Sequence, residues 1–136
     1  MPKPVSKPQQ VLRQLTTGAL AVQVWRTLLL VLVVAILYLA LAPAPPKGID
    51  TGWDKANHGL AFASLTVAAC FGWGTSFKRL VWSWLALLAF GGGIEIAQSF
   101  VPPRSAEWAD WLADAVGIAL GTLITMLLVR ARQDDQ

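Results

Sequence analysis

Charged residues are scarce in this sequence and unevenly spread. Only 14% of the 136 residues are Asp, Glu, Lys or Arg, which is about half the share found in ordinary soluble domains. A small soluble domain has a large surface for its volume and needs polar groups to cover it. Here four long stretches carry no charge, at residues 27–46, 59–77, 80–94 and 115–129. These stretches exclude a soluble globular domain, a disordered tail and a secreted disulfide scaffold, and they indicate a membrane protein.

Several signatures of other protein classes are also absent from the sequence. The single cysteine, Cys70, lies inside an apolar stretch, so no intramolecular disulfide can form and a small core residue is the simplest interpretation. The net charge is +3, but no dense Lys/Arg run accompanies it, and we expect no nucleic-acid partner. The sequence has no phosphate-binding glycine loop and no Gly-x-Ser-x-Gly elbow. We therefore predict no cofactor.

The charge-free stretches predict an all-α membrane protein, built as a bundle of four transmembrane helices. Crossing ~30 Å of hydrocarbon takes about 20 helical residues, and we expect spans at about residues 25–42, 57–73, 80–98 and 108–129. Residues 1–24 form an amino-terminal arm, for which a short interfacial helix and a mobile arm are both open. Residues 130–136 form a tail. The first span has features of a signal peptide, but Pro43 disfavours cleavage, so we interpret this span as an anchor.

The basic residues predict the orientation of the bundle. Cytoplasmic loops carry an excess of Lys and Arg, and eight of the eleven basic residues fall in the arm, the second loop and the tail. Both termini are therefore predicted to be cytoplasmic, in a multi-pass protein embedded in the lipid bilayer. The tryptophans lie near the ends of the spans, as in the aromatic belts of membrane proteins. The other three basic residues are Lys47, Lys55 and Arg104.

Most of the remaining polar residues fall at one predicted membrane boundary, the outer one. Asp54 and His58 are four residues apart at the start of the second span, and Asp110 and Asp114 have the same spacing in the fourth, so each pair shares a helix face. Charges near membrane depth usually face a bundle interior or a wet cavity. Helix capping and interfacial snorkelling are structural alternatives for several of them. The residues at this boundary are Asp54, Lys55, His58, Glu95, Gln98, Arg104, Asp110 and Asp114.

This group predicts a site for an anionic lipid or a cell-envelope precursor. The planar guanidinium of arginine suits phosphate. Histidine titrates close to neutral pH and can act as a general acid or base, oriented by a carboxylate. The candidate catalytic and orienting groups are His58, Glu95, Asp54 and Asp114. The candidate substrate-binding groups are Arg104, Lys55, Gln98 and Asp110.

Two other interpretations of the same residues remain open. In a structural or interaction protein, the pairs Glu95–Arg104 and Asp54–His58 would fix helix register. A histidine with several carboxylates would also suit Zn²⁺ or Mn²⁺, but the spacing matches no standard zinc signature, and we assign no metal. The sequence leaves open whether the protein is an enzyme and whether it forms a homo-oligomer.

Small residues predict where the fourth span packs. Gly117 and Gly121 continue the Asp110–Asp114 face with the GxxxG spacing of close helix contacts. We therefore expect this acidic face to point into the bundle. The run Gly91-Gly92-Gly93 allows the third span to bend or to approach a neighbour closely.

In this order the motifs resemble the VanZ-like family of small bacterial membrane proteins. The matching pattern is Asp54-Lys55-Ala-Asn-His58, Phe62, Glu95-Ile-Ala-Gln98, Arg104, Asp110 and the glycines at 117 and 121, over about residues 50–125. Members commonly have asparagine in place of Asp114 and glycine in place of Pro103. The resemblance implies a bacterial cytoplasmic (inner) membrane protein acting at the outer envelope surface, with a link to teicoplanin resistance. It does not imply a particular reaction.

Overall fold

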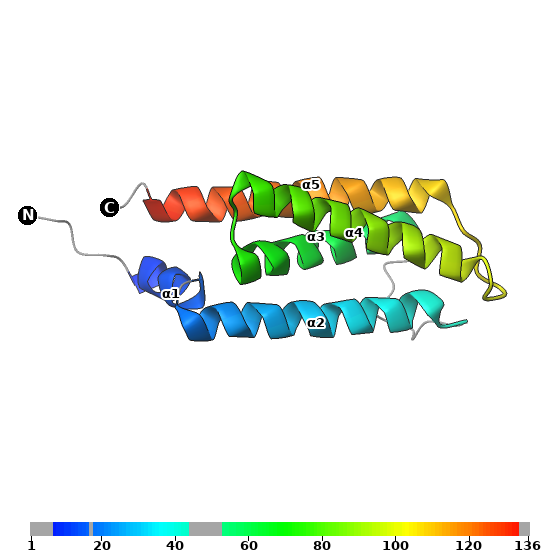
Figure 1. The fold of residues 1–136 in the computed structure, drawn as a ribbon, viewed down its shortest axis with the longest axis horizontal. Helices are drawn as coiled ribbons and strands as arrows, with labels where there is room; N and C mark the ends of the chain where they lie inside the picture. The colour runs from blue at the N-terminus through cyan, green and yellow to red at the C-terminus, as the bar shows by residue number, and fades with distance from the viewer. Residues whose placement is uncertain (1–6, 17, 44–52, 134–136) are drawn as a thin grey trace, which may run out of the picture.

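The computed structural model describes residues 7–16, 18–43 and 53–133, and it places most of them in five α-helices (Figure 1). The described part of the amino-terminal arm contains a helix at residues 7–16, and the position of this helix at a membrane interface stays a prediction. Gly18, with a φ of 99°, separates this helix from the next. The helices are α1 (Lys7–Thr16), α2 (Ala19–Leu41), α3 (Asp54–Trp73), α4 (Phe77–Gln98) and α5 (Trp108–Gln133).

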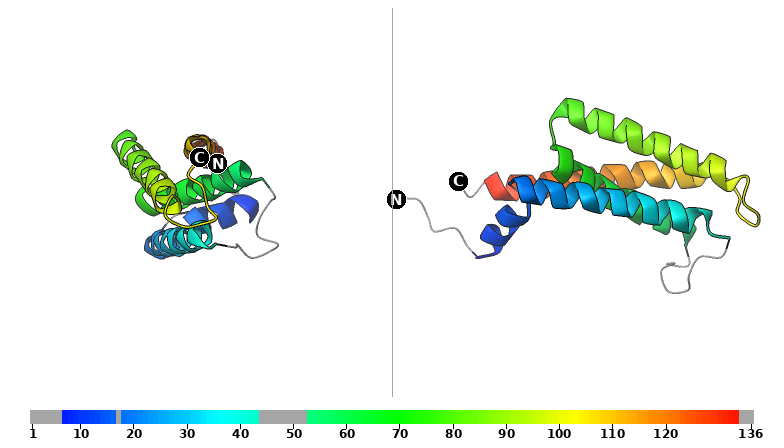
Figure 2. Two further views of the ribbon diagram at one scale, coloured as in Figure 1. Left: turned by 90° about the vertical axis from the view of Figure 1, so that its right-hand side faces the viewer. Right: turned by 60° about the horizontal axis from the view of Figure 1, so that its bottom comes forward.

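Helices α2 to α5 run side by side as a bundle, and the short α1 lies at an angle to the start of α2 (Figures 1 and 2). Helix α3 contacts α2, α4 and α5, and its contact with α5 is the most extensive in the bundle. The core residues come from α3, α4 and α5, and α2 packs one side against them. They are Phe62, Leu65, Leu87, Ile94 and Ile118.

Glycines on α5 bring it into backbone contact with α3. A Cβ atom at Gly117 would overlap the carbonyl oxygen of Gly59, and one at Gly121 would overlap that of Ala63. Both glycines are buried, as are Asp110 and Asp114 on the same face. The prediction that the acidic face of this helix points inward is confirmed.

Helix ends agree with the sequence prediction to within a few residues, except at the start of α2, which begins at Ala19 and not near residue 25. By length and composition, α2, α4 and α5 are apolar and long enough to cross a membrane within the described part of the chain. Helix α3 is less apolar than these three helices because its first turns are polar. It also packs against α2, α4 and α5, so less of its surface needs to be apolar. A membrane crossing by α3 therefore stays a prediction.

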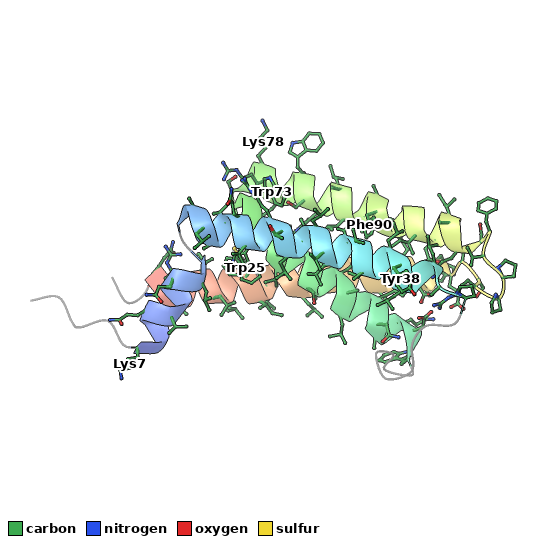
Figure 3. The ribbon with its side chains drawn as sticks, turned by 90° about the horizontal axis from the view of Figure 1, so that it is seen from below. Lys7, Trp25, Tyr38, Trp73, Lys78 and Phe90 are labelled. Atoms are coloured by element: carbon green, nitrogen blue, oxygen red, sulfur yellow. The ribbon has the colours of Figure 1, made fainter. Side chains whose placement is uncertain are left out.

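The two ends of the bundle differ in charge. The end formed by α1, the start of α2, the α3–α4 turn and the end of α5, called the basic end here, carries Lys78, Arg79, Arg130 and Arg132. Lys7, Trp25, Trp73 and Lys78 all lie toward this end in Figure 3. Arg26 Nε donates to Gly72 O at 2.9 Å and Arg79 Nη1 donates to Trp73 O at 2.7 Å. These contacts satisfy carbonyl groups that the end of a helix leaves open.

The opposite end is called the polar end. It is formed by the end of α2, the start of α3, the end of α4, the loop 99–107 and the start of α5 (Figure 1). All eight of the candidate site residues lie on these elements. Lys47 and Asp50 lie outside the described residues.

Candidate functional site

His58 and Asp114 form a buried pair between α3 and α5. His58 Nδ1 lies 2.8 Å from Asp114 Oδ1, and the side chain of Asp114 has no exposed surface. When Asp114 is ionised its carboxylate only accepts hydrogen bonds, so in that state Nδ1 carries the hydrogen and a neutral His58 has its lone pair on Nε2. The close approach of α3 and α5 at Gly59 and Gly117 positions this pair. Asp114 therefore fixes the orientation and the tautomer of His58.

Glu95 on α4 faces the other nitrogen of the imidazole. Its Oε1 lies 4.0 Å from His58 Nε2, beyond hydrogen-bond distance. Its Oε2 accepts a hydrogen bond of 2.7 Å from the backbone N–H of Glu107. Glu107 precedes the first residue of α5, where backbone N–H groups lack helical partners and a negative charge is favourable. Glu95 thus links the end of α4 to the start of α5 and keeps one oxygen directed at His58.

Asp110, Lys55 and Glu107 form a chain of ion pairs beside His58. Lys55 Nζ lies 3.0 Å from Glu107 Oε2 and 3.3 Å from Asp110 Oδ1. The hydrogen bond to Glu107, with that to Asp110, raises the pKa of Lys55 above its ordinary value. Asp110 is buried, whereas Lys55 and Glu107 are partly exposed. Asp54 is exposed in the first turn of α3, where a carboxylate is favourable.

Arg104 and Gln98 bind the end of α2. Arg104 Nε donates to Ala42 O and its Nη2 to Leu39 O, both at 3.1 Å, and Gln98 Nε2 donates to Ala40 O at 3.1 Å. These carbonyl groups are among the last of α2 and have no helical partner. The predicted Glu95–Arg104 pair is wrong: among the described residues the guanidinium makes no ion pair, because the α2 carbonyls occupy it. The structure thus places these two side chains in helix capping.

Buried oxygen atoms without partners distinguish this cluster from an ordinary structural network. Within the described part of the chain, Glu95 Oε1 and Asp114 Oδ2 are buried and make no hydrogen bond, whereas the buried Asp110 Oδ1 has the ammonium of Lys55 at 3.3 Å. Such a group costs about 1–3 kcal/mol, and more when it is charged. Counting the described residues only, the cluster contains five carboxylates, one lysine and one histidine. The site is rich in acceptors and short of donors.

The structure brings together six of the eight predicted site residues: Asp54, Lys55, His58, Glu95, Asp110 and Asp114. Sequence reasoning did not include Glu107 among the site residues, and it missed the backbone N–H of Glu107 as the partner of Glu95. Its position directly before the fourth predicted helix, where N–H groups are open, is the signal that identifies it.

The fold and the site define a helical membrane protein with a buried His–carboxylate cluster at one end of its bundle. A family profile described as VanZ/LLP1 matches residues 9–129, which is most of the chain. The chain therefore belongs to this family.

A similar protein from the fission yeast Schizosaccharomyces pombe carries the name "Uncharacterized protein C11E3.10". It is 34% identical over 107 residues, which make up 76% of this chain and 63% of the relative. The chain thus spans less than two thirds of the length of this relative. No solved structure matches the chain.

Proposed function

We propose that this VanZ-family protein binds and acts on the headgroup of an anionic lipid or a cell-envelope precursor at its polar end. The observation that carries the proposal is the unpaired oxygen atoms around His58. A cluster that served packing alone would have these acceptors paired, because each unpaired one is costly. A cluster that exchanges protons with a ligand keeps such groups available. Polar and ionisable residues in membrane helices commonly mark functional sites for the same reason.

In this proposal His58 is the group that exchanges a proton with the headgroup. Asp114 holds its Nδ1 at 2.8 Å, which leaves Nε2 as the reacting atom, and Glu95 lies on the Nε2 side. Histidine suits this role because its ordinary pKa is close to neutral. Lys55 is the partly exposed cation of the cluster, and it is the group we assign to the phosphate oxygen atoms. Arg104, bound to α2, is assigned to structure instead.

The location and the wider effect of this activity are also part of the proposal. The basic end faces the cytoplasm, so the polar end lies at the outer boundary of a bacterial inner membrane. For a VanZ-family member, an effect on teicoplanin susceptibility follows if the headgroup belongs to the cell envelope. The fungal relative favours a lipid over a precursor of the bacterial wall, because both kinds of cell contain lipids.

Lipid retention by the purified protein tests the proposal. The protein is equilibrated with equal amounts of phosphatidylglycerol and phosphatidylcholine, and the retained lipid is measured by native mass spectrometry. We expect preferential retention of phosphatidylglycerol, about tenfold weaker in Lys55→Gln since one charge-assisted contact contributes about 1.5–3 kcal/mol. Lys78→Gln, at the basic end, is the matched control and keeps the preference. Equal retention of the two lipids, or equal loss in both variants, contradicts the proposal.

A second measurement tests the assignment of His58. The protein is incubated with phosphatidylglycerol, and water-soluble phosphate compounds released from it are quantified for the unchanged protein and for His58→Gln. Glutamine keeps a polar side chain but does not exchange protons near neutral pH. We expect release to fall at least about a hundredfold, the usual contribution of general acid–base catalysis. Release that persists in His58→Gln contradicts the role of this residue.

A non-catalytic structural role is the second candidate, favoured by one observation. Arg104 and Gln98 make three hydrogen bonds to the end of α2, so part of the polar end does fix helix packing. In this candidate the His58 cluster would have the same purpose, and His58→Gln would reduce stability without altering lipid retention or release.

A further inference from the structure

We propose that the polar end holds a divalent metal ion, Zn²⁺ or Mn²⁺, ligated by Asp54, His58 and Asp110. One donor atom from each of these three side chains lies within 4.8 Å of the others. Glu95 lies outside this group of three, with its Oε1 4.0 Å from His58 Nε2. The inference deepens the proposed function, and it relies on that proposal only for what the ion does, since the binding itself is argued from the donor atoms.

The orientation of His58 is the first argument for the ion. Histidine ligands usually donate their second ring N–H to a carboxylate, which fixes the ring and its tautomer. Asp114 accepts from Nδ1 at 2.8 Å and has no exposed surface, so it already performs this role. The nitrogen left for a metal is Nε2.

The gap between His58 and Glu95 is the second argument. Zn²⁺ binds nitrogen and oxygen ligands at about 2.0–2.2 Å, so two ligands of one ion lie about 3–4 Å apart. Nε2 and Glu95 Oε1 are 4.0 Å apart, and Oε1 is buried with no hydrogen-bond partner. This separation matches that of two ligands on one ion, and Oε1 would join Asp54, His58 and Asp110 once the Glu95 side chain moves toward them. The unpaired, nearly buried Glu95 oxygen is an observation independent of the acidic cluster itself.

The charge balance of the site is the third argument. Asp110 Oδ1 is buried, and its partner is the ammonium of Lys55 at 3.3 Å. Among the residues that the structure describes, Lys55 and His58 are the cationic partners of the three buried carboxylates of Glu95, Asp110 and Asp114, so at most two positive charges meet three negative ones. An ion with one imidazole and several carboxylate ligands falls within the preferences of Zn²⁺ and Mn²⁺. Bound there, it would also give an otherwise acidic site the positive charge that a phosphate headgroup needs.

Metal titration in lipid-free detergent tests the inference. The protein is prepared without a polyhistidine tag, stripped with a chelator and titrated separately with Zn²⁺ and Mn²⁺ by calorimetry. We expect saturable binding of one ion per chain. Asp54→Asn and Asp110→Asn should each weaken metal binding by more than about tenfold, and Asp114→Asn should weaken it by about 10–100-fold. Asp54 is exposed, so its substitution should leave the fold intact. Glu107→Gln is the control: it removes one negative charge, as the Asp→Asn substitutions do, but it removes no metal ligand. It should change the affinity for the metal less than about threefold.

Lys55 supplies a readout that a structural role would not move. Its ammonium lies where it competes with the ion for Asp110, so Lys55→Gln should bind the metal more tightly while it retains phosphatidylglycerol less well. Weak binding without saturation, equal loss in Asp54→Asn and Glu107→Gln, or weaker binding in Lys55→Gln overturns the metal site. Because no lipid is present, these outcomes leave the proposed function intact. The proposed function would fail, and the metal site would stand, if the protein bound the metal saturably but showed no preference for the anionic lipid.

Discussion

Gly91 of α4 lies directly against the carboxylate of Asp114 on α5. A Cβ atom at residue 91 would overlap Asp114 Oδ2 and would lie 3.1 Å from Cζ of Phe62. Because Asp114 is fully buried and holds His58 through its other oxygen, it has no room to move aside without breaking that contact. The absence of a side chain at residue 91 is thus part of the site.

The first prediction concerns this glycine. Gly91→Ala should displace Asp114, reduce the free energy of unfolding by about 1–3 kcal/mol through overpacking, and weaken the retention of phosphatidylglycerol. Chemical unfolding in detergent and the lipid assay measure the two effects. Gly93→Ala is the control two residues along the same helix, because its Cβ meets nothing within 4 Å. It should be neutral or stabilise α4, since alanine is the better helix former. Equal effects of the two substitutions would contradict the role of Gly91.

The second prediction concerns the contact between α3 and α5, which is asymmetric. A Cβ at Gly117 would overlap Gly59 O, whereas a Cβ at Gly59 would lie at an ordinary 3.7 Å from Ala113 O. Gly117→Ala should therefore force the two helices apart and cost about 1–3 kcal/mol, while Gly59→Ala should be tolerated. Unfolding of both variants in one detergent gives the comparison. A larger loss in Gly59→Ala would show that the helices approach differently.

The third prediction separates structure from binding at Arg104. Its guanidinium donates to Leu39 O and Ala42 O, and hydrogen bonds from charged groups contribute about 1.5–3 kcal/mol each. Arg104→Lys keeps the charge but loses the planar fork, so it should destabilise the protein almost as much as Arg104→Gln. Both variants should keep the preference for phosphatidylglycerol. If Arg104→Lys retained full stability and Arg104→Gln alone lost the lipid, the arginine would be a phosphate ligand.

The fourth prediction is a pH dependence of stability. The pKa of Lys55 is raised above its usual 10.5, first by the hydrogen bond to Glu107 and then by that to Asp110. A group whose pKa is higher in the folded state stabilises the fold at pH values below the unfolded pKa, and loses this contribution as pH rises through the folded pKa. The stability difference between the unchanged protein and Lys55→Met should therefore be constant at pH values well below 10.5 and shrink as the pH rises above 10.5. Measuring a difference between two proteins cancels the titration of groups that do not interact with Lys55. A difference that grew with pH would contradict the ion pairs.

Much of the fold and of the candidate site follows from spacing along the helices. Asp110 and Asp114 were predicted to face inward because an interval of four residues places them on the face of Gly117 and Gly121, and both are buried. His58 follows from the same interval after Asp54. The spacing of residues in the sequence predicts which helix face they share, because the rotation per residue of a regular helix is fixed.

The contacts of Arg104 and Glu95 do not follow in this way. Arg104 lies in a loop without periodicity, and its partners are backbone carbonyls, which any residue of α2 would provide. The partner of Glu95 is likewise a backbone N–H. The start of α2 at Ala19 was missed because the polar residues Gln23 and Arg26 interrupt the apolar pattern, although a helix accommodates them at a membrane boundary. The identity of a backbone partner depends on tertiary packing, which the sequence pattern does not specify.

Helix α2 has no fully buried residue, yet polar side chains from α4 and from the loop 99–107 bind its C-terminal end. Its own Arg26 binds Gly72 O near its other end. The apolar side of such a helix resists sliding along its neighbours only weakly, whereas the hydrogen bonds at its two ends fix its axial position. The depth of α2 in a bilayer is therefore tied to that of α3 and α4, and is not free to follow the thickness of the membrane. In a thinner bilayer the bundle would have to tilt as one body, and the polar end would keep its internal geometry.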